Sequence, residues 1–315
     1  MKNIFITGVS GYIGMKIARA LADCPQVEKI VGIDVNAPRN VPERLMFIKR
    51  DVREPMLDLL TKHQADTVIH AAYVLPPIHD KALMEDINLG GTRSILNASA
   101  EAPVKHLLYT SSTTSYGFHP DNPVPLTEES PLRGNGDFTY SKNKKEIELL
   151  MQEFIGKHPE MAVTILRPCF VVGPGFANPL ARHLQKPFVL LPTKTAPFQF
   201  VHEDDLIRVI VMCLTETISG VFNVAGEGTM EFGEMVGKLG NHAVRLPFRL
   251  LYILNNLAWL MRMHFLTEFP STGLNLIKYP WLATSERLIA ETGFEFEYDT
   301  RSAFDDFVRA LNNRD

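Results

Sequence analysis

Short apolar runs alternate with longer helical patterns along the first half of the chain. Each run is apolar on both faces and rich in β-branched residues, as strands buried within a parallel sheet are. The predicted strands are Asn3–Gly8, Lys29–Val35, Met46–Asp51, Thr67–Ala72 and His106–Ser112. Helical patterns separate them near residues 12–23, 56–63, 82–102 and 138–157. This alternation predicts a parallel sheet that is covered by helices on both faces.

The pattern loosens beyond a sixth predicted strand, Met161–Pro168. A stretch rich in glycine and proline follows and marks a boundary near residue 173. One more strand is predicted at Gly220–Gly226, and residues 227–315 are mostly helical in pattern. We therefore expect an α/β fold, with a doubly wound parallel sheet and a smaller, mostly helical C-terminal domain. Such folds bind ligands at the carboxyl ends of the strands.

One later segment, Leu250–Met261, is apolar except for two asparagines, and Arg249 and Arg262 lie on either side of it. A helix needs about 20 apolar residues to span a bilayer, so the segment is too short to cross one. We expect a buried helix. A wall or lid of an apolar pocket and a helix that rests on a membrane are the alternatives.

Composition and charge narrow the class of protein. The chain has 315 residues, of which 45% are hydrophobic and 22% charged, as in a globular protein with a large core. A net charge of -4 gives no reason to expect a nucleic-acid partner. Three distant cysteines without a C-x-x-C pair favour a reduced, cytoplasmic protein. The N-terminus turns to glycine too early for a signal peptide, and we expect no stable membrane insertion.

A glycine-rich loop, ITGVSGYIG, joins the first predicted strand to the first predicted helix. Gly8, Gly11 and Gly14 are spaced three residues apart in it. Such glycines permit a tight turn, let backbone N–H groups approach a pyrophosphate and allow close packing of the helix on the sheet. The N-terminus of the following helix supplies free N–H groups and positive potential, which favour binding of the phosphates. The strand before the loop and the helix after it predict a dinucleotide site.

Acidic residues end the next two predicted strands. Asp34 lies 20 residues after Gly14, where a carboxylate can accept both ribose hydroxyls of an adenosine and repel a 2′-phosphate. That position favours NAD over NADP, although the nearby Arg39 would soften the preference. Asp51 is a candidate for the adenine amine, with a simple turn-forming role as the alternative.

Tyr140 and Lys144 in YSKNK are four residues apart, so they are neighbours on one face of a helix. A free phenol has a pKa of about 10, too high for a good base at neutral pH. A nearby ammonium favours the phenolate and lowers that pKa. We therefore predict an acid/base pair, with Lys142 and Lys145 in solvent.

These motifs, taken in order, resemble those of the extended short-chain dehydrogenases/reductases, the NAD-dependent epimerase/dehydratase family. The loop TGVSGYIG fits the family's T-G-x-x-G-x-x-G, and YSKNK fits Y-x-x-x-K. Further segments that fit are HAA at His70–Ala72, NLGGT at Asn88–Thr92, SSTTSYG at Ser111–Gly117, LRPCFVVGPG at Leu166–Gly175, FVHEDDL at Phe200–Leu206 and ATSERLIAETGFEFEYD at Ala283–Asp299. The resemblance implies an enzyme with an NAD-binding Rossmann domain at 1–172, to which 200–226 returns, and a substrate-binding domain at 173–315.

The resemblance also implies roles for individual residues. Ser112 matches the catalytic hydroxyl that holds the substrate oxygen beside Tyr140. Ser111, Thr113 and Thr114 are close competitors, unless all these hydroxyls merely satisfy backbone groups. The expected cofactor contacts are Gly8, Gly11, Tyr12, Ile13, Gly14, Asp34, Asp51, Val52, Ala71, Ala72, Tyr140, Lys144 and Pro168. The expected substrate contacts are Tyr73, Ser112, Asn178 and Phe198.

Other polar residues are assigned supporting roles. Asn88 is expected to order the active-site backbone. His70 is expected to pack within its strand, because no metal-ligand spacing surrounds it. Asp204 and Asp205 are expected to cap a helix start.

The chain departs from the family pattern in ways that bear on its substrate. SSTTSYG lacks the Thr-Asp-Glu of nucleotide-sugar 4,6-dehydratases, which disfavours dehydration. Phe198 stands where sugar epimerases usually carry an arginine for the nucleotide pyrophosphate. Tyr73, Val74 and Leu75 follow the fourth predicted strand, and with Phe198 they suggest a rather apolar substrate site.

Three functions stay open. The first is NAD-dependent hydride transfer or epimerisation at a secondary alcohol or ketone of a sugar-like substrate, such as a nucleotide sugar. The second is an NAD(P)-dependent dehydrogenase or ketoreductase for a steroid-like or acyl ketone. The third, a non-catalytic NAD sensor, is disfavoured because Ser112, Tyr140 and Lys144 are all present. The resemblance further implies a homodimer that pairs the helices near 82–102 and 138–157.

Overall fold

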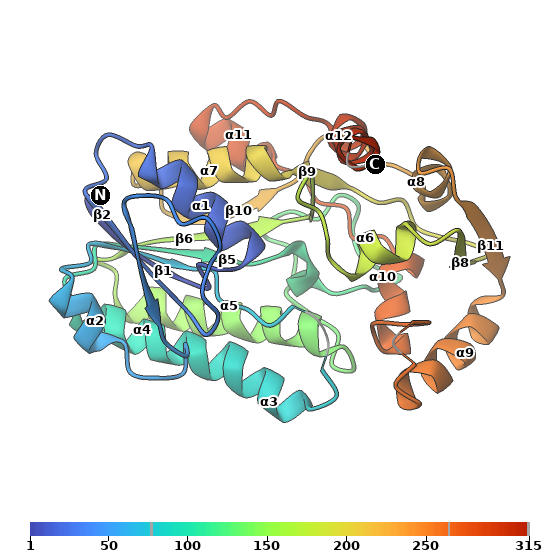
Figure 1. Ribbon diagram of the computed structural model, residues 1–315, viewed down its shortest axis with the longest axis horizontal. Helices are drawn as coiled ribbons and strands as arrows, with labels where there is room; N and C mark the ends of the chain where they lie inside the picture. The colour runs from blue at the N-terminus through green and yellow to red at the C-terminus, as the bar shows by residue number, and fades with distance from the viewer. Residues whose placement is uncertain (76–77, 264, 314–315) are drawn as a thin grey trace.

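Seven parallel strands form a central sheet within the residues described by the computed structural model, which are 1–75, 78–263 and 265–313 (Figure 1). The strand order is β10-β6-β5-β4-β1-β2-β3. The bounds are β1 Asn3–Thr7, β2 Lys29–Asp34, β3 Leu45–Lys49, β4 Thr67–His70, β5 His106–Thr110, β6 Ala162–Pro168 and β10 Gly220–Val224. Each strand lies within one or two residues of its prediction, and the doubly wound α/β fold is confirmed.

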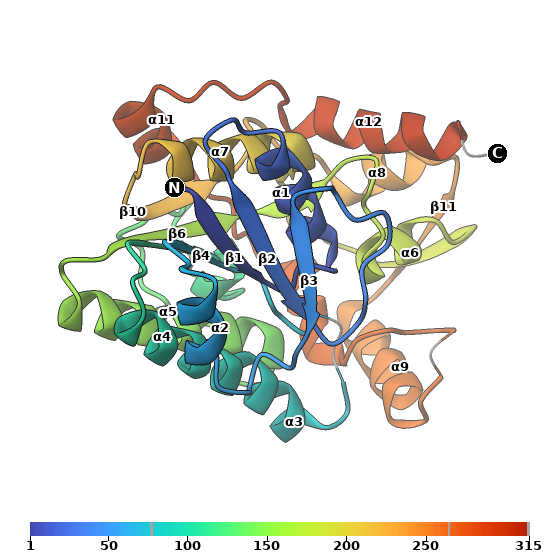
Figure 2. The same cartoon turned by 60° about the vertical axis from the view of Figure 1, so that its left-hand side comes forward.

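Helices cover both faces of this sheet (Figure 2). On one face lie α1 (Tyr12–Ala22) and α7 (Glu203–Thr215), which pack against each other. The other face carries α2 (Leu57–Lys62), α4 (Gly91–Glu101) and α5 (Thr139–Lys157). Two separate clusters of buried apolar side chains result, one for each face. The apolar character of the strands on both sides follows from this double burial.

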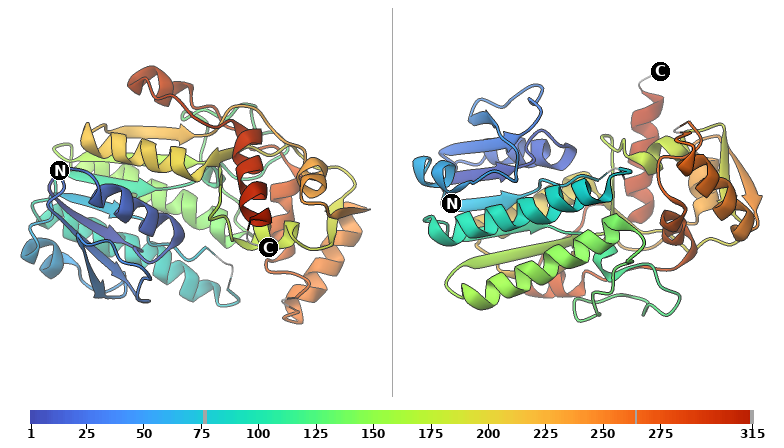
Figure 3. Two further views of the ribbon diagram at one scale, coloured as in Figure 1. Left: turned by 45° about the horizontal axis from the view of Figure 1, so that its top comes forward. Right: turned by 90° about the horizontal axis from the view of Figure 1, so that it is seen from below.

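The helix predicted near 82–102 contains a π-helical turn. It consists of α3 (Lys81–Glu85), a π-helical turn η1 (Asp86–Gly90) and α4, which run continuously (Figure 3). Such single π-helical turns occur frequently at functional sites. Here the turn contains Asn88, which contacts the loop after β4.

The C-terminal part combines short strands with helices. Two parallel pairs lie outside the central sheet: β7 (Phe170–Val172) with β9 (Phe200–His202), and β8 (Phe188–Pro192) with β11 (His242–Leu246). The helical elements are η2 (Thr113–Tyr116) near the sheet, then α6 (Pro179–Leu184), α8 (Phe232–Lys238), α9 (Phe248–Leu260), η3 (Ser271–Leu274), α10 (Asn275–Lys278), α11 (Glu286–Thr292) and α12 (Thr300–Asn312). Strand β10 pairs with β6, so the chain returns to the central sheet after β9 and α7.

The expectation of a buried helix at 250–261 is wrong. The segment is helical, as α9, but only Leu251 and Ala258 of this helix are buried. Its other large apolar side chains are mostly exposed, for example Ile253 at 57% and Leu260 at 66%. Among the described residues, no helix combines the length and apolarity that crossing a membrane requires.

Asp204 and Asp205 were predicted to cap the start of α7, but the structure has a different cap. His202, not an acid, caps the helix, because its Nδ1 accepts the Asp204 N–H at 3.2 Å. The buried Asp205 carboxylate instead accepts the N–H groups of Glu297 and Tyr298 at 3.1 and 3.0 Å. It therefore holds the segment before α12 against α7.

Candidate active site

The glycine loop leaves no room for side chains at two positions. Gly8 has φ +71°, and a Cβ there would lie 2.6 Å from the backbone of Ala72. At Gly14 a Cβ would lie 2.2 Å from the Gly8 carbonyl oxygen. Helix α1 begins at Tyr12 without a side-chain cap on its first turn. Close backbone packing and N–H groups that no side chain occupies make this loop suited to a pyrophosphate.

Asp34 lies at the end of β2, beside this loop. Its carboxylate accepts the Ser10 N–H at 3.2 Å and the Asn36 N–H at 3.1 Å. These two bonds orient the half-buried carboxylate and leave lone pairs for further donors. The arrangement fits the predicted contact with ribose hydroxyls.

The predicted adenine contact, Asp51, already has a strong partner. The Nε and Nη2 groups of Arg53 donate to its carboxylate at 3.0 and 2.7 Å, and this bonding lowers the pKa of Asp51. Arg53 also pairs with Asp86 at the start of η1, at 2.8 Å. No local pattern predicts this bridge, since Asp86 is distant along the chain. Val52 packs against Gly91, where a Cβ would lie 2.5 Å from the Val52 Cγ1.

Tyr140 is the second residue of α5, and its phenol faces hydroxyls at the end of β5. The neighbouring hydroxyls of Ser112 and Thr114 act to lower its pKa, but burial outweighs them and the net pKa is raised. Ser112 caps η2, where its Oγ accepts the Thr114 N–H at 3.2 Å. The loop after β4 adds Tyr73, whose ring meets that of Tyr140 edge to face at 5.3 Å between centroids.

The competing hydroxyls of the predicted site have other partners. Ser111 donates to Glu148 Oε1 at 2.5 Å, and Thr113 donates to the Pro168 carbonyl oxygen at 3.4 Å. Ser112 and Thr114 are therefore the hydroxyls beside Tyr140. Ala71 is one of the residues predicted to contact the cofactor, and its N–H donates to the Thr7 carbonyl oxygen at 3.2 Å.

The ammonium of Lys144 bonds to the end of β5 rather than to Tyr140. It donates to the Thr110 carbonyl oxygen at 2.8 Å and to the Tyr109 Oη at 3.2 Å. It also lies 4.1 Å from the centroid of the Tyr73 ring, a cation–π contact. Burial lowers the pKa of Lys144 to about 7, against the opposing effect of Glu148.

Burial acts against the predicted effect of Lys144 on Tyr140. The pKa of Tyr140 is raised because the phenol is desolvated. The lysine itself loses affinity for its proton by burial. The two side chains share a helix face, as their spacing predicted, without direct hydrogen bonding.

Asn88 and His70 have the supporting roles that their positions suggest. Asn88 is 1% exposed, and its Oδ1 accepts the Val74 N–H at 2.9 Å. It thereby holds the backbone next to Tyr73. His70 lies between Thr7 and Thr92, at 2.8 and 3.0 Å, and burial lowers its pKa to about 3. No cluster of three or more potential metal ligands occurs in the described part of the chain.

Two of the predicted substrate contacts are occupied within the protein. Phe198 is fully buried, with its ring packed against those of Phe200, Phe232 and Trp281. Phe198 therefore does not line an open pocket. Phe170, whose ring also packs against Phe198, is half-buried. The Asn178 Oδ1 caps α6 by accepting the N–H groups of Leu180 and Ala181 at 2.9 and 3.1 Å.

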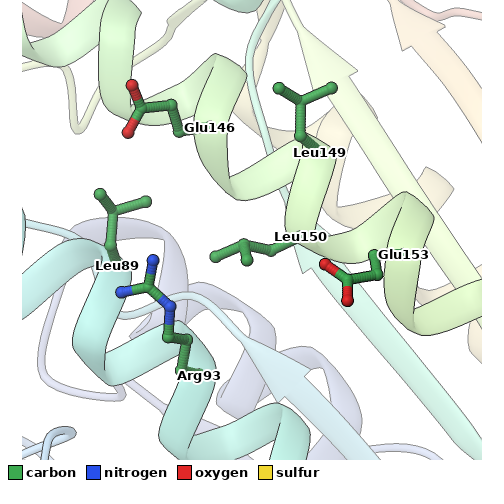
Figure 4. A pocket seen from close by; sticks show the side chains of 6 residues that line it. All are labelled: Leu89, Arg93, Glu146, Leu149, Leu150 and Glu153. Atoms are coloured by element: carbon green, nitrogen blue, oxygen red, sulfur yellow. The ribbon is translucent and has the colours of Figure 1, made fainter.

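A surface pocket lies away from these residues, between the outer faces of α4 and α5 (Figure 4). It is lined by Leu89, Arg93, Glu146, Leu149, Leu150 and Glu153. Its walls contain none of the predicted catalytic residues. It occupies the face on which a pairing of helices from two copies was predicted.

Comparison with protein families gives one match over most of the chain. The model of the NAD dependent epimerase/dehydratase family matches residues 4–225. A Mycobacterium tuberculosis protein, Rv0501, is 27% identical, and the alignment covers 98% of this chain and 84% of that protein. The N-acetyl-alpha-D-glucosaminyl-diphospho-ditrans,octacis-undecaprenol 4-epimerase of Escherichia coli O157:H7 is 29% identical over 54% of this chain and 49% of its own length.

Solved structures share the fold at low sequence identity. A dTDP-glucose 4,6-dehydratase from Bacillus anthracis in complex with NAD has a TM-score of 0.77 at 16% identity, covering 100% of this chain and 98% of that one. A UDP-glucose 4-epimerase from Thermotoga maritima with UDP-glucose has a TM-score of 0.77 at 17% identity, with 99% of both chains covered.

Proposed function

Because the chain belongs to the NAD dependent epimerase/dehydratase family, we propose that it is an NAD-dependent oxidoreductase or epimerase acting at a secondary alcohol or ketone of a sugar-like substrate. The observation that carries the proposal is that the Tyr140 phenol lies beside the hydroxyls of Ser112 and Thr114. They lie beyond the carboxyl end of β5. Strand β4 separates β5 from β1, so the glycine loop after β1 is on the same edge of the sheet.

The residues present fit NAD. Backbone approaches so closely at Gly8 and Gly14 that only glycine is accommodated, as a pyrophosphate-binding loop requires. Asp34 is oriented by two N–H groups beside that loop. NAD, when bound, supplies the hydride acceptor and donor of the reaction.

The protein's own side chains manage the substrate oxygen. Ser112 and Thr114 are positioned to hold that oxygen by hydrogen bonds next to the Tyr140 Oη. Tyr140 takes the hydroxyl proton when the alcohol is oxidised and returns a proton when the ketone is reduced. Lys144 is held by Thr110 and Tyr109, and in its charged form it favours the phenolate.

Epimerisation or net oxidation and reduction fits this site better than dehydration. Elimination of water needs a group that donates a proton to the leaving hydroxyl and a base for the carbon proton. In this chain the segment after β5 has only hydroxyl side chains, Ser111 to Ser115, before Tyr116. The hypothesis of an apolar ketone substrate rests on Phe198 and on apolar segments. Phe198 is fully buried, so this residue does not support the hypothesis.

A second candidate substrate is a sugar carried on a polyprenyl diphosphate. The Escherichia coli relative is named for such a substrate. The exposed apolar side chains of α9 favour this candidate, because a polyprenyl chain is held in a membrane while its sugar is processed.

The test compares Tyr140→Phe with Tyr252→Phe as a matched control on α9. UDP-sugars, dTDP-sugars and a polyprenyl diphosphate sugar are screened in the presence of NAD, first by thermal shift and then by turnover. We expect Tyr140→Phe to lower kcat at least about 100-fold, while the control keeps its activity. Undiminished turnover by Tyr140→Phe would exclude the assigned chemistry.

We also propose a homodimer through α4 and α5. Support comes from exposed Leu149 on α5, at 45%, beside the pocket of Figure 4. Leu149→Glu should shift sedimentation toward the monomer, whereas Val124→Glu, at a 56% exposed position, should not. A cytoplasmic location and the lack of a nucleic-acid partner stay predictions.

A further inference from the structure

Helix α9 presents two different apolar faces. Leu251 and Ala258 face inward and are buried. The adjacent, outward face carries side chains that are 45% to 70% exposed: Leu250, Ile253, Leu254, Leu257, Leu260 and Met261. Their spacing of three and four residues places them along one stripe of the helix. The stripe continues into Phe265 and Leu266, which are 71% and 49% exposed.

This concentration of exposed apolar surface is unusual for a folded protein. Scattered exposed apolar side chains are normal, but contiguous patches mark sites of interaction. Helix α9 lies at the periphery of the C-terminal part, away from the central sheet (Figures 1 and 2). A flat or curved surface can therefore approach it without meeting the sheet.

The chain segment that carries the stripe has only positive charges, and the acid that follows it, Glu268, is paired with Arg182. Residues 235–267 contain no aspartate or glutamate, although the whole chain has a net charge of -4. Arg249 and Arg262 stand at the two ends of α9 and are exposed. Within the described part of the chain neither of them forms an ion pair. An apolar stripe bounded by free guanidinium groups is complementary to a surface with an apolar interior and anionic head groups.

We propose that α9 docks the protein on the surface of an anionic lipid bilayer. The stripe of α9 enters the boundary between head groups and acyl chains, and Arg249 and Arg262 bind lipid phosphates. Helix α9 lies parallel to the bilayer, because its 13 residues are too few to cross it. This attachment is reversible and does not depend on which substrate the active site takes.

The docking helix touches the loop that borders the active site. The His79 ring stacks on Trp259 of α9 at 4.2 Å between centroids, and its Nε2 lies 3.2 Å from the Trp259 carbonyl oxygen. The same loop begins with Tyr73, which packs against Tyr140. Docking through α9 therefore brings the membrane next to the loop at the substrate site.

The test measures binding of the full-length chain to vesicles of phosphatidylcholine, with and without phosphatidylglycerol, by co-sedimentation. Three proteins are compared with the wild type: Ile253→Ser/Leu257→Ser, Arg249→Glu/Arg262→Glu, and Val124→Ser/Ile289→Ser as a control at equally exposed positions elsewhere. Circular dichroism melting checks that each variant is folded.

We expect the wild type to bind anionic vesicles more tightly than neutral ones and to release them at high salt. The apolar variant should lose more than about tenfold in partition, and removal of each arginine should cost about fivefold. The control should bind like the wild type. Lack of wild-type binding to anionic vesicles, or equal binding by the α9 variants and the control, would overturn the proposal. Loss of a dimer in the folded Ile253→Ser/Leu257→Ser variant, seen by sedimentation in the absence of lipid, would also overturn it in favour of a second copy.

Discussion

Tyr140 and Lys144 illustrate how burial sets the charge of the proposed catalytic pair. Both side chains lose water at the end of β5, and this raises the pKa of the phenol while lowering that of the ammonium to about 7. The phenol is thus neutral near neutral pH, while the ammonium of Lys144 loses its proton within that same range. The positive charge of an oxidised nicotinamide would then favour the phenolate when NAD is bound.

Lys144→Met tests this balance through the pH dependence of stability. The lysine has a pKa of about 7 in the folded protein, against an ordinary value of 10.5. Between these values the unfolded chain binds the extra proton, so stability rises with pH across that window. Lys144→Met should remove up to about 1.4 kcal/mol of this rise per pH unit. Urea unfolding at pH 7.5 and 9.5 measures this rise, with half-buried Lys145→Met as the control. Equal slopes of stability against pH for the wild type and Lys144→Met would contradict the prediction.

Asp34 permits a test of cofactor choice. Its carboxylate is held by Ser10 and Asn36 beside the glycine loop, where a 2′-phosphate would be repelled. Asp34→Ala should weaken NAD binding about tenfold through loss of hydrogen bonds to a charged group, and should narrow the gap to NADP. Isothermal titration with both cofactors provides the measurement. Equal affinities of the wild type for NAD and NADP would refute the role of Asp34.

For single residues, the spacing along the sequence predicts which side chains share a helix face, but it does not predict their hydrogen-bond partners. The helix places Tyr140 and Lys144 on one face, as their separation of four residues requires. The actual partners of Lys144 are Tyr109 and Thr110 of β5, which no local pattern connects to it. Phe198 stands at a predicted arginine position, but its complete burial depends on rings from distant segments, which the sequence does not reveal.

Among the secondary-structure elements, α5 and β6 are joined by a buried ion pair. Arg167 donates to Glu148 Oε2 through Nε at 2.8 Å and Nη2 at 2.6 Å, and both side chains are almost fully buried. Ser111 at the end of β5 donates to the same carboxylate. This network fixes the helix that carries Tyr140 against two strands of the sheet.

Glu148→Gln should destabilise the fold by about 3–5 kcal/mol, because it leaves a buried guanidinium without its counter-charge. Glu148→Gln/Arg167→Met should recover part of that loss. Glu153→Gln, which breaks the exposed pair with Lys157 on the same helix, should change stability little. Urea unfolding of the three variants distinguishes these outcomes, and a Glu148→Gln effect as small as that of Glu153→Gln would disprove the role of the pair.

The long elements could be predicted from sequence, whereas the short ones could not. Strands of the central sheet are apolar on both faces, and this signal needs no knowledge of partners. Strands β7 and β9 have three residues each and exist because they pair with each other across the chain. Helix α9 has an apolar pattern typical of a buried helix, and the sequence does not show that the protein covers only one side of it.

At the scale of the whole molecule, buried histidines predict sensitivity to acid. His70 and His106 are almost fully buried, and burial lowers their pKa values to about 3 and about 4 from an ordinary value of 6.5. As pH falls below 6.5 the unfolded chain gains protons that the folded chain does not, so stability falls.

Each histidine should contribute a slope of up to about 1.4 kcal/mol per pH unit between pH 6.5 and its lowered pKa. His106→Gln keeps a hydrogen-bonding group near Thr164, the partner of His106 at 2.7 Å, and should reduce the slope. Unfolding by urea at pH 7.0 and 5.0 measures the difference. A variant with the wild-type slope would show that His106 is protonated in the folded protein.

Strand β10 lies at the edge of the sheet, next to β6. This position constrains how the chain folds during synthesis and how its parts can be exchanged with those of relatives. When β1 through β6 have emerged from the ribosome, the outer edge of β6 stays unpaired until Gly220–Val224 has also emerged. The residues synthesised in between include β7, β8 and α6 of the C-terminal part. An exchange of C-terminal parts between relatives must therefore join the two genes on both sides of β10, because one junction after β6 would also exchange this strand.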